Sequence, residues 1–275
     1  MNTAKMSVSE KKKFYQSLSS LSIAKAKEVL GLSRIVRLNR SAKMIHTAAN
    51  TATLQFLLYF HPVEVDGHVM CPRCEHCKAN CLVASGRARC FSTDGYNRLI
   101  DTKRKRSELF LYNRDLFMKI LIREINNARA KAARDGMDFM IRLNGTSDIS
   151  PLAFQYDGKN ILEMYPDVQF CEYTKVYQYL NLGKKYPNLD YTFSFDGYNW
   201  DECEKALSNG FRVSVVIDSK VLPKTFNGLD VVDGDLSDRR DLDGKSIVGL
   251  RYKKTRKPVY DSKFIVKADA PRLGW

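Results

Sequence analysis

The chain has 275 residues, 44% of them hydrophobic, so it can bury one large core or two small ones. This composition excludes a disordered chain and a collagen-like chain. The 45 Lys and Arg side chains exceed the 31 Asp and Glu side chains, and the net charge is +14. The excess lies at the two ends, because residues 1–50 hold ten basic and two acidic side chains and residues 245–275 hold nine and two. The sequence between them is close to neutral.

Basic ends of this kind predict a nucleic-acid partner, because clustered cations release counterions when they bind a phosphate backbone. Solubility alone is the alternative explanation. At the carboxyl end, Tyr252 interrupts the basic run and could stack on a base. The candidate nucleic-acid contacts are Lys11, Lys12, Lys13, Arg251, Lys253, Lys254, Arg256 and Lys257.

The apolar runs are too short for a membrane-spanning helix, which needs about 18 residues. The lysines at the amino terminus are not followed by an apolar segment with a small-residue cleavage site, as a secretory signal would require. We therefore expect no membrane partner and a cytoplasmic location.

In chain order, the first expected elements are two helices within residues 7–30. Ser7 or Ser9 caps the first helix, and the second runs from Ser22 to Leu30 before Gly31 ends it. A strand is expected over Thr53–Phe60, and one long helix is expected within Lys105–Arg134, where apolar residues recur at helical spacing.

Six short apolar runs then alternate with helical or irregular connections. Parallel strands need such long connections, so the pattern predicts an α/β fold arranged as a complete or partial (β/α) barrel. The runs cover residues 138–143, 168–173, 191–195, 211–217, 229–234 and 246–252. We divide the chain into a basic helical amino-terminal region (1–50), a barrel-like domain (51–252) and a basic tail (253–275).

Polar side chains follow several of these runs. In barrels and open α/β sheets, the functional face lies at the carboxyl ends of the strands, so such residues are candidates for catalysis. The candidates are Asp148, Glu172, Lys175 and Asp196.

Four cysteines, Cys71, Cys74, Cys77 and Cys81, form a Cys-x2-Cys-x2-Cys-x3-Cys run. Thiolates this close can converge on one metal centre, and soft sulfur ligands select zinc or iron–sulfur clusters. Structural zinc sites usually use two separated cysteine pairs, whereas a compact run is typical of ferredoxins, so an iron–sulfur cluster of the 4Fe-4S type is favoured and zinc is the alternative. Substitute ligands are Cys90, His68 and His76.

The sequence from Cys77 to Arg87 resembles the cysteine-rich loop of the phage Gene product 88 family. Three further segments resemble that family in the same order: Ile141–Asp148, Val168–Lys175, and Asp233–Asp235 with Ile247–Leu250. The resemblance covers roughly residues 40–252. It implies a metal cluster and an origin in a phage or plasmid, hence a bacterial host.

Members of this family look similar to radical S-adenosylmethionine proteins, which combine a cysteine loop with an incomplete barrel. By that resemblance, Gly145, Thr146 and Ser147 would bind S-adenosylmethionine. The cysteine spacing departs from the usual Cys-x3-Cys-x2-Cys: four ligands close the cluster, whereas Cys71, Cys77 and Cys81 alone would leave one iron open.

Two functional hypotheses follow. The first is an iron–sulfur protein that binds or acts on nucleic acid, with radical-type chemistry at the strand ends. The second is a non-enzymatic, replication-associated DNA- or RNA-binding protein with a structural zinc or a closed cluster. Phosphate-binding and dinucleotide-binding glycine motifs are absent from the sequence.

Overall fold

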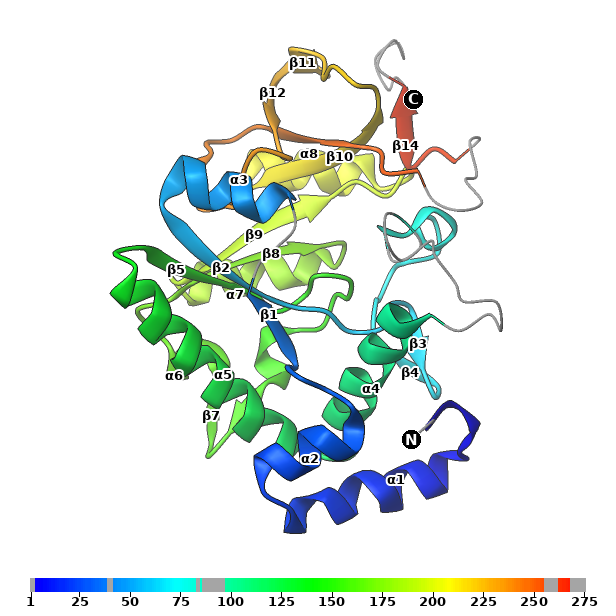
Figure 1. The fold of residues 1–275 in the computed structure, drawn as a ribbon. Coiled ribbons are helices and arrows are strands. Elements are labelled where there is room, and N and C mark those ends of the chain that lie inside the picture. The colour runs from blue at the N-terminus through cyan, green and yellow to red at the C-terminus, as the bar shows by residue number, and fades with distance from the viewer. Residues whose placement is uncertain (1–2, 39–41, 83–84, 86–96, 255–261, 268–275) are drawn as a thin grey trace.

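The computed structural model describes residues 3–38, 42–82, 85, 97–254 and 262–267. Its centre is one large sheet with seven parallel strands (Figure 1). In spatial order these are β2 (Thr53–Leu58), β5 (Asp138–Arg142), β8 (Gln169–Thr174), β9 (Leu189–Ser194), β10 (Arg212–Asp218), β13 (Ile247–Arg251) and β12 (Leu229–Asp233).

The expected α/β fold with parallel strands is confirmed, and the six apolar runs are six of these strands. One antiparallel strand flanks each edge: β1 (Val36–Leu38) pairs with β2, and β11 (Thr225–Phe226) pairs with β12. Within the described ranges the two edges do not pair with each other, so the sheet is open and no closed barrel is formed. The order of the strands also departs from simple succession, because β12 lies outside β13.

A short last strand, β14 (Ile265–Lys267), returns the chain to the centre of the sheet. It runs parallel to β10 at residues 216–218, whereas β9 pairs with β10 at residues 212–214. One edge of β10 pairs with β13 over residues 213–217. On the opposite edge, β14 therefore pairs with β10 beyond the point where β9 ends its pairing. The carboxyl-terminal segment therefore lies at the carboxyl ends of the parallel strands.

The two amino-terminal helices are confirmed. Ser7 caps α1 (Val8–Ser17) in a capping box with Glu10, and Ser22 caps α2 (Ile23–Leu30). Gly31 ends α2 with a φ of 66°, a left-handed conformation that glycine adopts without steric cost. A third helix, α3 (Ala42–Thr51), leads into β2.

The single long helix expected within Lys105–Arg134 is wrong in one respect, because the structure has two helices there. The first is α4 (Arg98–Tyr112) and the second is α5 (Arg114–Arg134). The break falls at Asn113, whose φ and ψ of −146° and 70° are not helical and whose side chain accepts from the backbone N–H of Leu116. Asparagine competes well for such capping positions.

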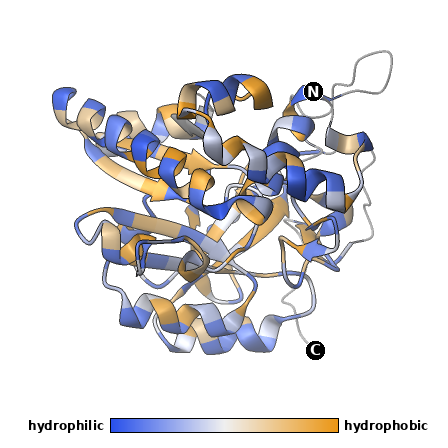
Figure 2. Cartoon of the chain, turned by 90° about the horizontal axis from the view of Figure 1, so that it is seen from below, coloured by the Kyte–Doolittle hydropathy of each residue, from blue (hydrophilic) through white to orange (hydrophobic). Residues whose placement is uncertain are grey.

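One face of the sheet is apolar and packs against helices. Phe56, Ile141, Phe170, Phe193 and Val215 lie on this face and belong to the main core. Figure 2 shows the hydrophobic residues gathered on strands and inner helix surfaces, with hydrophilic residues outside. The helices that contact these strands are α5, α7 (Leu180–Lys185) and α8 (Trp200–Ser208).

The opposite face of the sheet is polar. Arg142 of β5, Tyr173 of β8, Thr192 of β9 and Ser214 of β10 alternate with the core residues and so point to this side. Helix α3 and the segment at 236–243 supply side chains that pair with it, as described below. A parallel sheet in an α/β protein is usually apolar on both faces, so this polar face departs from the usual pattern.

Two hairpins and one short helix complete the fold. The hairpins are β3 (Glu64–Val65) with β4 (His68–Val69), and β6 (Gln155–Tyr156) with β7 (Lys159–Asn160). The helix is α6 (Ile161–Met164). Among the described helices, none has the length and apolar character needed to span a membrane.

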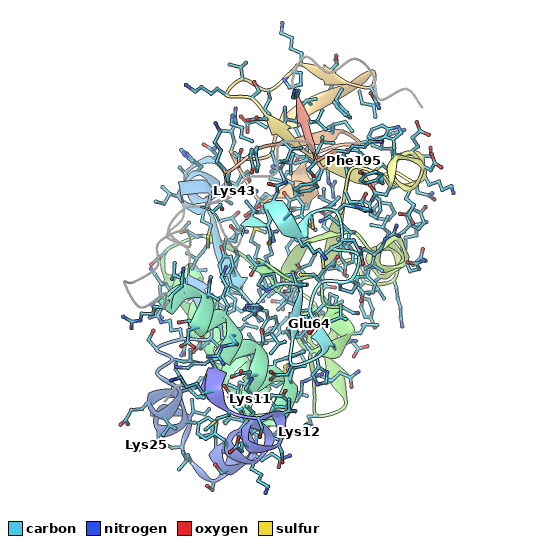
Figure 3. All side chains as sticks on the ribbon, turned by 90° about the vertical axis from the view of Figure 1, so that its right-hand side faces the viewer. Lys11, Lys12, Lys25, Lys43, Glu64 and Phe195 are labelled. Carbon is cyan, nitrogen blue, oxygen red and sulfur yellow. The ribbon has the colours of Figure 1, made fainter. Side chains whose placement is uncertain are left out.

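The first helix and the last described strand lie at opposite ends of the molecule. Figure 1 places α1 at the bottom and β14 at the top. Figure 3 agrees, with Lys11, Lys12 and Lys25 at one end and Phe195, which follows β9, toward the other, and it places Lys43 of α3 toward the same end as Phe195. Among the described residues, the lysines of α1 and α2 therefore do not join those of β14 in one basic patch.

Candidate metal centre at the strand ends

The four-cysteine segment, residues 71–81, here called the cysteine loop, lies over the carboxyl ends of the parallel strands. On the side of β5, the backbone N–H of Asp148 donates to the carbonyl of Met70 at 2.9 Å. The Cys71 thiol donates to the carbonyl of Thr146 at 3.5 Å. The loop is therefore attached to the segment that follows β5, as expected for a functional site at this edge.

The other side of the cysteine loop contacts the segments that follow β9 and β13. Arg73 pairs with Glu202 of α8 at 2.8 Å, and the Tyr252 hydroxyl donates to Asn80 at 3.0 Å. Contacts to segments following three strands thus hold the loop in place across the rim of the sheet.

All four thiols of the cysteine loop are partly exposed and unpaired by disulfides. Burial, followed by the charges of Cys81, Asp148 and Cys74, raises the pKa of Cys71 to about 12, while a backbone hydrogen bond acts in the opposite direction. Within the described part of the chain, no three His, Cys, Asp or Glu side chains are placed to hold a metal ion. Binding a metal therefore requires the cysteine side chains to turn toward a common centre.

Lys175, at the end of β8, reaches the cysteine loop. Its ammonium lies close enough to Cys77, Asp148 and Cys71 for their charges to act on it. Burial lowers the pKa of Lys175, but the charges of Cys77, Asp148 and Cys71 outweigh it, and the pKa lies above its ordinary value. A permanent cation therefore stands beside two of the four thiols.

Asp148 joins the ends of β5 and β8. Its carboxylate accepts from the Thr174 hydroxyl at 3.1 Å and from the backbone N–H of Lys175 at 2.9 Å. Burial raises the pKa of Asp148 to about 6, and the two hydrogen bonds and the Lys175 charge oppose that rise. Asp148 and Lys175 are therefore the predicted catalytic candidates that lie beside Cys71 and Cys77.

The predicted cofactor-binding residues Gly145, Thr146 and Ser147 lie at the same edge but are engaged within the fold. The Thr146 hydroxyl donates to the carbonyl of Phe60 at 2.6 Å, and the Ser147 hydroxyl donates to Asn144 at 2.8 Å. A Cβ at Gly145 would lie 2.6 Å from the ring of Tyr59, so this position needs glycine for packing.

The remaining two catalytic candidates have local structural partners. Glu172 points to the helix-covered face and accepts from the backbone N–H groups of Leu143 and Asn144. Burial raises its pKa to about 7, although Arg142 and these hydrogen bonds act against the rise. Asp196 accepts from the backbone N–H groups of Tyr198 and Asn199 and so shapes the turn before α8.

Sequence reasoning missed a charged cluster on the polar face of the sheet. Asp238 is 2% exposed and contacts Lys43 of α3, Arg142 and the amide of Gln55. The ring of Tyr173 lies against both cations, 4.4 Å from the Arg142 guanidinium and 5.6 Å from the Lys43 ammonium. The signal was present in Arg142 and Tyr173, two polar residues at or near the carboxyl ends of β5 and β8.

Some polar atoms on this face have no hydrogen-bond partner among the described residues. They include the Arg142 Nε, the Tyr173 hydroxyl and the Thr192 hydroxyl, all of them buried. Tyr173 and Thr192 are register partners on adjacent strands, so these groups lie close together. They are donors and acceptors that a polar ligand could use.

The residues predicted to contact nucleic acid differ in their exposure and ion pairing. Lys11 is 4% exposed and pairs with Asp66 and Glu108, so it does not present its charge to a ligand, and we correct that prediction. Arg251 and Lys253 are paired with Asp233 or Asp235. Those that are exposed are Lys12, Lys13, Lys253 and Lys254, while Arg256 and Lys257 lie outside the described residues.

The three residues considered as substitute metal ligands lie in different parts of the chain. Cys90 lies outside the described residues, as does most of the segment that follows Cys81. His68 is on β4, with its ring 6.3 Å from that of Tyr112. His76 belongs to the cysteine loop and packs on Tyr198.

Comparison with known proteins gives one match. Residues 32–268 match the family described as Gene product 88, a longer stretch than the resemblance noted from the cysteine loop and the strand segments. Neither the curated proteins nor the solved structures contain a match to this chain. The chain belongs to the Gene product 88 family.

Proposed function

We propose that this chain is an iron–sulfur protein of a phage or plasmid that binds or acts on nucleic acid at the rim of the sheet. The observation that carries the proposal is the attachment of the cysteine loop to the strand ends, where the Cys71 thiol donates to the carbonyl of Thr146 at 3.5 Å and the Lys175 ammonium lies near Cys77. A cluster held by several thiolates is negatively charged, and a partly buried cation beside the sulfur atoms offsets that charge.

The donor set suits such a cluster. Cys71, Cys74, Cys77 and Cys81 are soft ligands in one partly exposed segment, and the loop is fastened at both sides. Zinc held by the same four thiols is the alternative, and it would make the centre structural.

A finer proposal is chemistry of the radical S-adenosylmethionine type, which requires that Cys71, Cys77 and Cys81 alone hold the cluster and that one iron stays open. The cysteine loop follows β2, the first of the parallel strands, and residues 144–148 follow β5, its neighbour. Bound there beside an iron–sulfur cluster, S-adenosylmethionine would supply a carbon-centred radical. In this chain Gly145, Thr146 and Ser147 would line its site, with Asp148 orienting Lys175 through the backbone hydrogen bond.

The polar face of the sheet supports a ligand-binding role over a purely structural one. Buried groups without partners are costly to a fold. Arg142 and Tyr173 present such groups on the polar face of the sheet, and the cysteine loop crosses the rim of that sheet. We infer that part of the substrate enters on this side.

Metal analysis tests the cluster. The full chain is purified without oxygen and assayed for iron, sulfide, zinc and visible absorption. We expect iron and sulfide with cluster absorption, and loss of both in Cys77→Ala and Cys81→Ala. Cys171→Ala is the matched control, because Cys171 is buried in β8, where its thiol donates to Asp241, and its loss should leave metal content unchanged. One zinc per chain without visible absorption would overturn the iron–sulfur proposal in favour of the structural alternative.

Binding across a salt series tests the partner. Affinity for single-stranded DNA, duplex DNA and RNA should fall steeply as salt increases, because counterion release drives phosphate contacts. If none of the three binds at low salt, the nucleic-acid part of the proposal is wrong, whatever the metal.

A further inference from the structure

Tyr198 presents an aromatic ring to solvent beside the cysteine loop. The side chain is 55% exposed, and among the described residues the other large hydrophobic side chains of comparable exposure are all aliphatic. It lies in the turn between β9 and α8, at the carboxyl ends of the strands. An exposed ring at a functional edge is a candidate contact surface.

Two neighbours flank this ring. The ring of His76 lies 4.2 Å away, centroid to centroid, and inclined by 38°. The ammonium of Lys263 lies 5.0 Å from the Tyr198 centroid. Since His76 immediately precedes Cys77, the surface formed by Tyr198, His76 and Lys263 adjoins the proposed cluster.

The turn holds Tyr198 in a fixed position. Asp196 accepts from the backbone N–H of Tyr198 at 2.9 Å. Gly197 has a φ of 104°, and a Cβ there would lie 2.7 Å from the backbone nitrogen of Phe264 and 2.8 Å from the carbonyl carbon of Lys263. This close backbone approach brings Lys263 to the ring, so the surface exists before any ligand binds.

The cation shown at the ring is Lys263. On the neighbouring segments, Lys78 of the cysteine loop and Lys267 of β14 are exposed, and so is Glu75, which directly precedes His76. Glu202 of α8 contacts the cysteine loop, where its charge is paired with Arg73. Cations around an exposed aromatic ring are the features with which proteins bind single strands, where each base offers a free face for stacking.

We propose that Tyr198 is a stacking surface for a base of single-stranded nucleic acid, with Lys263 and Lys78 contacting the flanking phosphates. This inference rests on the nucleic-acid part of the proposed function and names its substrate form. A duplex buries its base faces, so it would contact the lysines and not the ring.

Anisotropy titrations on the full metal-loaded chain test it, with a mixed-sequence single-stranded oligonucleotide and the matching duplex. Tyr198→Ala should weaken single-strand binding roughly 5- to 100-fold and leave duplex binding unchanged. The salt slope should stay the same, because no phosphate contact is removed. Tyr198→Phe keeps the ring and should bind as the unaltered chain does. Lys263→Met should instead lower the salt slope by about one unit.

A second readout separates stacking from general damage. A 2-aminopurine base in the strand should be quenched by the unaltered chain and by Tyr198→Phe, but not by Tyr198→Leu, which keeps apolar bulk without a π face. If the unaltered chain binds the single strand and both Tyr198→Ala and Tyr198→Leu match it, the inference is wrong while nucleic-acid binding stands. If the unaltered chain binds neither probe at low salt, the proposed partner itself fails and the inference fails with it.

Discussion

Both carboxylate oxygens of Asp66 accept from the ammonium of Lys11, at 2.7 and 2.9 Å, across 55 residues of sequence. The same ammonium lies 2.9 Å from Glu108, which is fully buried and also accepts from the Tyr15 hydroxyl. Asp66 sits at the tip of the β3–β4 hairpin, which leads directly into the cysteine loop. Helix α1 is thereby joined to both α4 and that hairpin.

Replacing Lys11 with Met should destabilise the protein by about 1–3 kcal/mol, because the buried Glu108 would keep Arg104 as its cation while Asp66 would keep only the Tyr112 hydroxyl. Urea unfolding followed by circular dichroism measures the change. Lys12→Met is the matched control, since Lys12 is exposed on the same helix and its loss should not alter the free energy of unfolding measurably. Equal stability of the two variants would contradict a structural role for Lys11.

Lys175→Met should weaken metal binding by the cysteine loop about 10- to 100-fold, the range typical when a residue that supports metal ligands is lost. Competition with a chelator measures the affinity. Lys185→Met, which removes an exposed lysine at the end of α7, should change nothing. An unchanged affinity in Lys175→Met would show that the ammonium does not stabilise the bound metal.

Asp238→Asn should destabilise the fold by about 3–5 kcal/mol at neutral pH, because Lys43 and Arg142 would remain buried without a counter-charge. Asp157→Asn, in the exposed turn between β6 and β7, is the control and should unfold as the unaltered chain does. Thermal and urea unfolding would both reveal the difference.

The same residue predicts a pH dependence. Burial acts to raise the pKa of Asp238, but the charges of Lys43 and Arg142 outweigh it and hold the pKa below its ordinary value of 3.8. The stabilisation is therefore complete above about pH 4 and is lost as the pH falls below that value. Unfolding free energies measured from pH 5 to pH 2 should fall less steeply in Asp238→Asn. An identical slope in both proteins would disprove the linkage.

Gly145→Ala should cost about 1–3 kcal/mol by overpacking, because its Cβ would meet the Tyr59 ring and, at 2.9 Å, the carbonyl oxygen of Leu58. Gly244→Ala is the control, since a Cβ there meets no atom within 4 Å. If Gly145→Ala retained full stability and lost only S-adenosylmethionine binding, glycine would be required for the cofactor and not for packing.

Sequence patterns were sufficient for the elements whose formation depends on neighbours along the chain. Ser7 and Ser22 cap helices that begin directly after them, and Gly31 ends the second helix. The parallel strands were recognisable because each is a short apolar run separated from the next by a long connection. The break at Asn113 was not, since helical periodicity continues on both sides of it and only its capping bond interrupts the helix.

The parts of the candidate site formed by residues close together in the sequence could be predicted. The parts that depend on partners far apart in the sequence could not. The cysteine loop was found from its spacing, and Asp148 and Lys175 from their position after strands. Lys11 resembled any other lysine of a basic run, because its partners Asp66 and Glu108 are far away in the sequence. Charge counts alone cannot distinguish a solvated lysine from a buried one.

The family match begins at residue 32, after α2. Yet Glu108 and Asp66, both within the matched range, rely on Lys11 and Tyr15 from before it. A fragment trimmed to the shared region would expose the underside of α4, and it would leave Glu108 paired with Arg104 alone and Asp66 with the Tyr112 hydroxyl alone. The part of the chain that the family has in common is thus smaller than the part that must fold together, and an expression fragment should keep the first two helices.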